Sequence, residues 1–189
     1  MKEFALKAFD ESAEIKRRFA RDHADKIVQV AQLIGQALRT GHKVLLFGNG
    51  GSATDAAHIA AEFVGRYKRE RAPFPAIALA TDIAAITCIA NDYGFEELFA
   101  RQVRAHGRQG DVAIAISTSG NSPNVLKAVE AAKALGLTTI AWTGGSGGKL
   151  AGMVDYAFVV PSTLTARIQE SHITLGHVLC ELIEDHVLA

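Results

Sequence analysis

The sequence predicts an α/β fold: a doubly wound parallel sheet with helices on both faces, preceded by a helical extension. Two observations support this prediction. Five short apolar runs rich in β-branched residues recur along the chain, separated by segments with helical periodicity, and this pattern is typical of strands buried on both faces. The first 40 residues carry apolar side chains at helical spacing and contain no proline.

The N-terminal segment, about residues 1–40, is predicted to form one or two long helices. Its apolar residues recur at helical spacing from Phe4 to Leu38. In the case of two helices the break lies near Asp22. In both cases we expect the helical segment to end at Gly41, which can close a helix in the left-handed conformation. Because one sheet buries only part of so much apolar helix, this segment is expected to serve oligomerisation.

Five strands and a closing helix follow. The strands are predicted at "KVLLF" (43–47), "AIALA" (76–80), "VAIAI" (112–116), "TTIAW" (138–142) and "YAFVV" (156–160). A helical pattern runs from about Thr165 to Leu188. No linker or low-complexity segment divides the chain, so residues 1–189 are predicted to form a single domain.

Composition argues against nucleic acid and membrane as partners. Twenty basic residues balance twenty acidic ones, so the chain lacks the net charge of a dedicated nucleic-acid binder. No apolar run reaches the roughly 18 residues that span a bilayer, and the first residues are too charged for a secretory signal. We therefore expect a cytoplasmic protein. Cys88 and Cys180 have no CxxC partner and are predicted to be reduced packing residues.

The first strand leads into a glycine turn, "GNGGSA" (48–53), that opens a helix. The turn formally fits the dinucleotide pattern G-x-G-x-x-A, which also requires an acidic residue about 20 residues later, at the end of the next strand. Here that distance falls in the charged stretch "RYKRER", and no lysine closes the turn as in a P-loop. Nucleotide binding is therefore the less favoured interpretation of this turn.

The third strand leads into "STSGNSPN" (117–124), with Ser122 as predicted N-cap and Pro123 as first helical residue. Backbone N–H groups at a helix N-terminus, together with Ser and Thr hydroxyls, favour a phosphate without Lys or Arg. For this loop alone, a capped turn without a ligand is the alternative. Both loops follow strands of an open sheet, where ligands bind, so together they favour one small phosphorylated ligand. The loop "TGGSGG" (143–148) is assigned no chemistry.

The helix after the glycine turn places Asp55, His58 and Glu62 on one face, because they are spaced three and four residues apart. A carboxylate and an imidazole therefore converge there. For His58 taken alone, a hydrogen-bonded core histidine is the commoner explanation. The run Arg66, Lys68, Arg69 and Arg71 is predicted to be a solvated face, with sugar or subunit contact as the alternative.

Four separated segments carry a resemblance to a known family. They are "GNGGSATDAAHIAAEFVGRY", "CIANDYGFEELFARQV", "ISTSGNSPNVLKA" and "ARIQESHITLGHVLCELIE", in this order and across nearly the whole chain. They resemble the phosphoheptose isomerases of the sugar isomerase (SIS) domain superfamily, whose fold is flavodoxin-like. The resemblance implies conversion of sedoheptulose 7-phosphate to D-glycero-D-manno-heptose 7-phosphate, in bacterial lipopolysaccharide heptose biosynthesis, by a cytoplasmic homotetramer.

The resemblance also implies roles for individual residues. It makes Glu62 and His177 the catalytic acid/base pair. It implies that the substrate contacts Asn49, Gly50, Gly51, Glu62, Asn91, Asp92 and Gln169, and that Ser117, Thr118, Ser119 and Ser122 hold its phosphate. As in several members, one zinc ion per subunit would be bound by His58, Glu62, Gln169 and His177.

The spacing of these residues permits a shared site without requiring it. Ketose-to-aldose conversion moves a proton from C1 to C2 through an enediol, which needs a base, a proton donor and a group that stabilises the oxyanion. Gln169 and His177 lie about 12 Å apart along one helix, so they reach a common point only with extended side chains or from different subunits. His172, between them, is the local alternative to His177 as the catalytic histidine.

Two other functions remain as alternatives. A non-catalytic SIS protein, which binds or regulates, would keep the fold and the loops without needing the proton carriers. The presence of both Glu62 and His177 favours an enzyme over such a protein. An SIS isomerase of another phosphosugar would share the phosphate loop, which is generic.

Overall fold

The computed structural model describes residues 1–187 and contains one five-stranded parallel sheet in the order β2-β1-β3-β4-β5. The strands are β1 (Val44–Gly48), β2 (Ala76–Ala78), β3 (Val112–Ile116), β4 (Thr138–Gly144) and β5 (Tyr156–Val160). Each overlaps a predicted apolar run, although β2 is shorter and β4 extends to Gly144. The strand order is that of flavodoxin-like folds, and the predicted fold class is confirmed.

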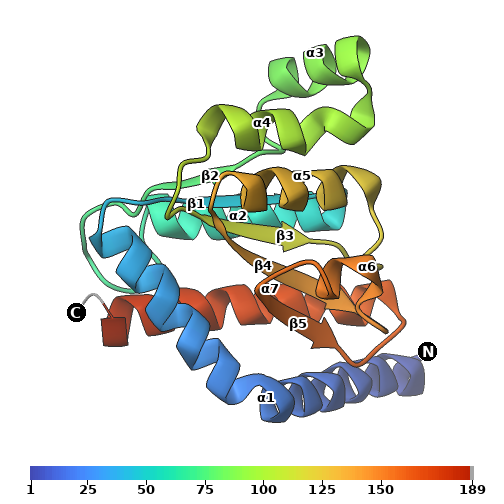
Figure 1. The fold of residues 1–189 in the computed structure, drawn as a ribbon. Coiled ribbons are helices and arrows are strands. Elements are labelled where there is room, and N and C mark those ends of the chain that lie inside the picture. Colours follow the sequence, from blue (N-terminus) through green and yellow to red (C-terminus); the bar gives the residue numbers. More distant parts are fainter. Residues whose placement is uncertain (188–189) are drawn as a thin grey trace.

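Helices cover both faces of the sheet (Figure 1). They are α1 (Lys2–Arg39), α2 (Gly51–Val64), α3 (Ile83–Tyr93), α4 (Leu98–His106), α5 (Pro123–Ala134), α6 (Gly148–Ala151) and α7 (Thr165–Leu182). A 3₁₀ turn, η1 (Phe95–Glu97), precedes α4, and a π-helical segment, η2 (Ile183–Val187), follows α7. The closing helix was predicted to reach Leu188, which lies outside the described residues.

Two hydrophobic cores lie on opposite sides of the sheet. Successive residues of β1 face opposite ways, so Leu46 packs with α1, α2 and α7 whereas Leu45 packs with α4 and α5. Both residues are fully buried, as all of β1 and β3 are. Burial on both faces explains why the strands are continuous apolar runs rather than alternating ones.

The N-terminal segment is one helix, the first of the two predicted forms, and it is not broken near Asp22. Helix α1 ends at Arg39, and Gly41 has a φ of 82°, as predicted for a glycine that closes a helix. The helix changes direction along its length and passes beside β5 (Figure 1). There His23 Nε2 accepts a hydrogen bond from Val159 N at 3.2 Å, and Lys26 Nζ donates one to Ala157 O at 2.9 Å. These side chains satisfy backbone groups at the edge of the sheet.

Helix α3 contributes no buried residue, and this overturns one prediction. Cys88 is exposed on α3, so it is not a packing residue, whereas Cys180 is buried in α7 as predicted. Both thiols are free, and burial raises the pKa of the Cys180 thiol to about 12. Several large apolar side chains of α1 and α3 are also exposed, among them Phe4, Phe9 and Ile83. Among residues 1–187, no helix is both long and apolar enough to cross a membrane.

Candidate active site

Two loops meet at the carboxyl ends of β1 and β3, the point where the strand order of the sheet reverses. In such sheets the loops at this point diverge to opposite faces and leave a crevice for a ligand. The side-chain amides of Asn49 and Asn124 join the loops by two hydrogen bonds, each 2.9 Å long. The hydroxyls of Ser117 and Ser122 lie 3.1 Å apart across the second loop. The two loops are therefore joined directly by hydrogen bonds, which places them close enough to contact one ligand.

The loop after β3 has the features of an anion cradle. Helix α5 begins with Ser122 as its N-cap and Pro123 as its first residue, which confirms the prediction. Within residues 1–187, the backbone N–H groups of Thr118 and Ser119 donate no hydrogen bond to the protein. A Cβ on Gly120 would overlap the backbone of Gly147, so the loop after β4 packs directly against this one. Free backbone N–H groups in a loop that leads into a helix N-terminus favour a bound anion.

The loops after β4 and β5 lie beside the cradle, an arrangement that the sequence patterns did not predict. A cavity of about 290 Å³ is lined by Thr118 and Ser119 together with residues of those loops and of the start of α7, namely Gly144, Gly145, Ser146, Ser162, Thr163, Thr165 and Ile168. The loop at 143–148 had been assigned no chemistry. The predicted parallel sheet contained the information needed to place these loops beside the cradle, because the carboxyl ends of all parallel strands meet at one edge of the sheet.

A second cluster lies along α2 and α7, which run side by side in the same direction. His58 Nε2 lies 3.0 Å from His177 Nε2 and 3.3 Å from Glu62 Oε1. A side chain at Gly176 would collide with Ile59, so glycine at this position permits the close approach of the two helices. The His58 side chain is 51% exposed and that of Glu62 is 23% exposed, so the cluster is open to a ligand.

This cluster has the chemistry of a divalent metal site. One ligand atom from each of His58, Glu62 and His177 lies within 4.8 Å of the others. Two imidazole nitrogens and a carboxylate oxygen form a set that zinc accepts, and catalytic zinc sites use three protein ligands with a fourth position left open. The residues present therefore fit such an ion. They also fit proton transfer, because each can take or give a proton.

Gln169, the fourth predicted zinc ligand, lies elsewhere within the chain. Its side-chain amide packs on Gly51, where any Cβ would overlap it. Gly51 precedes His58 by seven residues, about 10 Å of helix. Gln169 thus lies beside the glycine turn, and the structure brings together three of the four predicted ligands.

Two further predicted site residues lie away from both the anion cradle and the histidine cluster. Asn91 and Asp92 are on exposed α3, where the Asn91 amide donates to Asp92 Oδ1 at 2.8 Å. Helix α3 packs on η1 and α4, on the far side of the sheet from α7 (Figure 1). Within a single chain these two side chains do not join the cradle or the histidine cluster.

His172 and Asp55 lie on the two helices that carry the cluster, α7 and α2. His172 is fully buried, and its Nε2 lies 3.1 Å from the carbonyl oxygen of Thr143. Burial lowers the pKa of His172 to about 4, although that hydrogen bond opposes the shift. It is therefore a neutral core residue rather than an alternative to His177. Burial raises the pKa of Asp55, and its neighbour His58 partly offsets this.

The basic run after α2 is not a simple solvated face. The Arg71 side chain is only 12% exposed and pairs with buried Glu184 at 2.9 Å. Lys68 and Arg69 remain exposed and pair with Glu181 and Asp185. The prediction of a solvated face is therefore wrong for Arg71.

Known proteins are similar to this chain over nearly its whole length. A family model described as SIS domain matches residues 8–144. The chain is 60% identical to the phosphoheptose isomerase of Aquifex aeolicus over 187 residues, 99% of this chain and 98% of the relative. It is 60% identical to the phosphoheptose isomerase of Thermodesulfovibrio yellowstonii over 179 residues, 95% of this chain and 89% of that one. A solved phosphoheptose isomerase from Neisseria gonorrhoeae matches with a TM-score of 0.91 and 46% identity, over 97% of this chain and 98% of that one.

Proposed function

Because this chain belongs to the SIS-domain family and, within it, to the phosphoheptose isomerases, we propose that it converts sedoheptulose 7-phosphate to D-glycero-D-manno-heptose 7-phosphate. This is an aldose–ketose isomerisation in bacterial heptose biosynthesis, and we place it in the cytoplasm. The observation that carries the proposal is the convergence of His58, Glu62 and His177 on a chain that is 60% identical to named phosphoheptose isomerases. The anion cradle at 117–122 accounts for the phosphate of the substrate.

The reaction needs a base at C1 and a proton donor at the oxygens. Glu62 is the proposed base, since a carboxylate can take the C1 proton and return it to C2 of the enediol. His177 is the proposed partner, which moves a proton between the two oxygens. His58 Nε2 lies 3.0 Å from His177 Nε2, with which it can share a proton, and 3.3 Å from Glu62 Oε1, so the three groups lie within reach of one another. Ser117, Thr118, Ser119 and Ser122, with the N–H groups of their loop, bind the phosphate.

Zinc is the proposed metal. His58, Glu62 and His177 would hold it, and when bound it would polarise the substrate carbonyl as a Lewis acid. The set contains no thiolate, and Glu62 also serves as the base, so we expect moderate affinity.

We further propose a homotetramer in which the partner subunit's Gln169 completes the site. Three observations support this. Gln169 lies at Gly51 in its own chain, about 10 Å of helix from His58. The apolar residues Phe4, Phe9 and Ile83 are 76–80% exposed. Asn91 and Asp92 lie on α3, which has no buried residue within one chain. A second copy packed on these helices would bury the apolar groups and bring the remaining predicted residues to a site.

Two alternatives are less well supported. A non-catalytic SIS protein has no need for the three-residue cluster. An isomerase of another phosphosugar would share the cradle but would be an unexpected match to phosphoheptose isomerases over almost the full length of the chain.

The experiment is incubation of the pure protein with sedoheptulose 7-phosphate, with product aldose followed over time. Fructose 6-phosphate serves as the comparison substrate. We expect aldose formation from the seven-carbon substrate and a much lower rate from the six-carbon one. Binding without turnover would favour the non-catalytic alternative, and preference for fructose 6-phosphate would favour the other isomerase.

A further inference from the structure

The geometry points to Tyr67 as a positioning residue for His177: its ring fixes the orientation of the imidazole, and buried Glu184 holds the loop that carries it. The loop, defined here as residues 66–71, connects α2 to β2. None of these residues was assigned a catalytic role by the sequence. The inference rests on the proposed function only for its kinetic readout.

The His177 ring lies between two other rings. Tyr67 stacks on it, with ring centroids 5.5 Å apart and an interplanar angle of 18°. His58 meets it edge-on, with centroids 5.2 Å apart and an angle of 68°. A stacked ring limits rotation of the imidazole about its Cβ–Cγ bond, because rotation would separate the two ring faces. Tyr67 therefore determines which way His177 Nε2 points.

Glu184 fixes the loop from the other side. Its carboxylate accepts hydrogen bonds from the backbone N–H groups of Tyr67 and Lys68, each at 2.8 Å, and of Arg69 at 3.0 Å. The residue is 3% exposed. Consecutive backbone N–H groups that converge in this way form an anion-binding nest, and the protein's own carboxylate occupies it. The hydrogen bond from the Tyr67 backbone N–H to the Glu184 carboxylate therefore fixes the position of Tyr67.

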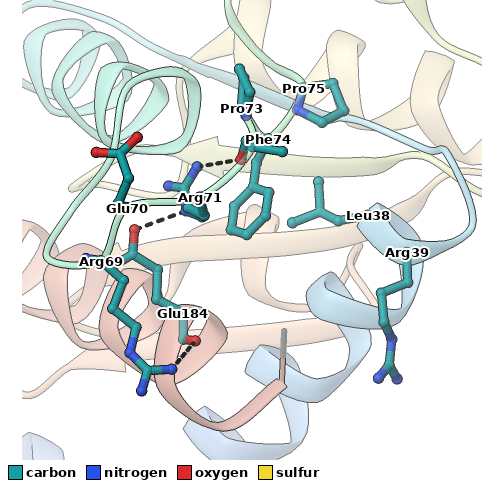
Figure 2. A pocket seen from close by; sticks show the side chains of 10 residues that line it. Leu38, Arg39, Arg69, Glu70, Arg71, Pro73, Phe74, Pro75 and Glu184 are labelled. Atoms are coloured by element: carbon teal, nitrogen blue, oxygen red, sulfur yellow. Dashed lines mark hydrogen bonds and ion pairs between the residues drawn. The ribbon is translucent and has the colours of Figure 1, made fainter. Parts of the chain in front are cut away.

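Arg71 connects this loop to the helix that carries Glu62. Its Nε donates to Glu184 at 2.9 Å, and its Nη atoms donate to the backbone oxygens of Glu62 and Phe63 at 2.8 and 2.9 Å. Figure 2 shows Glu184 between Arg71 and Arg69, with Phe74 beside the Arg71 guanidinium. The guanidinium carbon lies 3.6 Å from the centre of the Phe74 ring. The end of α2 is therefore joined to the segment after α7, close to the cluster that both helices build.

These contacts explain why an aromatic ring is needed at position 67 but a hydroxyl is not. Within residues 1–187, the Tyr67 hydroxyl makes no hydrogen bond, whereas the ring faces His177. Stacking is thus expected to survive in Tyr67→Phe and to be lost in Tyr67→Ala. A purely structural role for Tyr67 would lower stability without a specific effect on kcat.

The test compares Tyr67→Phe and Tyr67→Ala, with Tyr156→Ala as the matched control. Tyr156 is a half-buried ring on the edge strand β5, where its hydroxyl accepts a hydrogen bond from the Gln29 amide of α1 at 3.5 Å. We expect Tyr67→Phe to keep the wild-type kcat. We expect Tyr67→Ala to lose about 10- to 100-fold in kcat with KM unchanged, since small misplacement of a catalytic group has effects of this size. Tyr156→Ala should keep kcat.

A second readout does not depend on turnover. The NMR signal of the His177 ring should carry a ring-current shift in the wild type and in Tyr67→Phe, and lose it in Tyr67→Ala. If the wild type shows this shift but does not isomerise a heptose phosphate, the proposed function fails and the positioning contact stands. The inference is overturned if Tyr67→Ala keeps kcat, if it loses kcat only as Tyr156→Ala does, or if the shift is absent.

Discussion

The imidazoles of His58 and His177 meet Nε2 to Nε2 at 3.0 Å, although 119 residues separate them in sequence. Two ring nitrogens at this distance share one proton or one metal ion, since two N–H groups would repel each other. Glu62 lies 3.3 Å from the same His58 nitrogen. The three side chains therefore act as a unit, and a change to one is expected to alter the other two.

The first prediction concerns the base. Glu62→Gln keeps the size and polarity of the side chain but removes its ability to take a proton. We expect kcat to fall by roughly 10²- to 10⁴-fold, the usual contribution of general base catalysis, with folding and substrate binding retained. A coupled kinetic assay with circular dichroism as the folding control measures this. A near wild-type rate would mean that another group is the base.

The second prediction concerns the metal. We expect the purified protein to contain zinc, to lose it and much of its activity on chelation, and to regain both when zinc is returned. His58→Ala should bind less zinc by elemental analysis because it removes one of three ligands. His106→Ala, an exposed histidine at the end of α4, is the control and should bind as the wild type does. A fully active metal-free enzyme that gains nothing from zinc would leave the acid/base residues as the whole mechanism.

The third prediction concerns acid stability. Burial would raise the pKa of Glu184, but the N–H groups of Arg69, Lys68 and Tyr67 and the Arg71 guanidinium hold it at about 2, below its usual 4.5. A folded-state pKa below the unfolded one stabilises the protein above the unfolded pKa, and this stability is lost as pH falls from about 4.5 towards 2. The contribution at neutral pH is about 3 kcal/mol.

Glu184→Gln should therefore lower the free energy of unfolding by about this amount at neutral pH, and the difference from wild type should shrink as pH falls. Denaturant unfolding at a series of pH values between neutral and about 2 measures this difference in the free energy of unfolding. Glu181→Gln, three residues earlier at the end of α7 and paired with exposed Lys68, is the control and should change little. A deficit that does not vary with pH would show that Glu184 does not act through its charge.

The fourth prediction concerns assembly. Light scattering should give the mass of a tetramer, and Phe9→Ser should weaken the assembly because this 80% exposed side chain is proposed to lie at an interface. Gln169→Ala and His177→Ala should each be inactive alone. Co-expression of the two variants should restore part of the activity, since some sites would combine an intact His177 with the partner subunit's Gln169. A monomer mass, or no recovery in mixed oligomers, would contradict this arrangement.

The fold and the cradle were predictable because they depend on local patterns. Apolar runs marked every strand, and the turns at 48–53 and 117–124 carry their glycines, hydroxyls and N-cap in consecutive positions. The spacing of His58 and Glu62 placed them on one helix face. What failed depends on distant partners. Arg71 looked solvated because its partner Glu184 lies 113 residues away in the sequence. Cys88 looked buried because the sequence of α3 is apolar, but no residue of this helix is fully buried among the described residues.

The central claim is that Glu62 carries a proton between C1 and C2 of a ketose phosphate. The most direct measurement is incubation with sedoheptulose 7-phosphate in deuterium oxide until equilibrium, followed by NMR of the aldose. We predict deuterium at C2 of the heptose with the wild-type protein, because a proton held by Glu62 exchanges with solvent over many turnovers. With Glu62→Gln we predict at most a trace of product over the same incubation time. Aldose that keeps all of its original hydrogen would contradict the account, because it would mean that hydrogen moves directly between the two carbons.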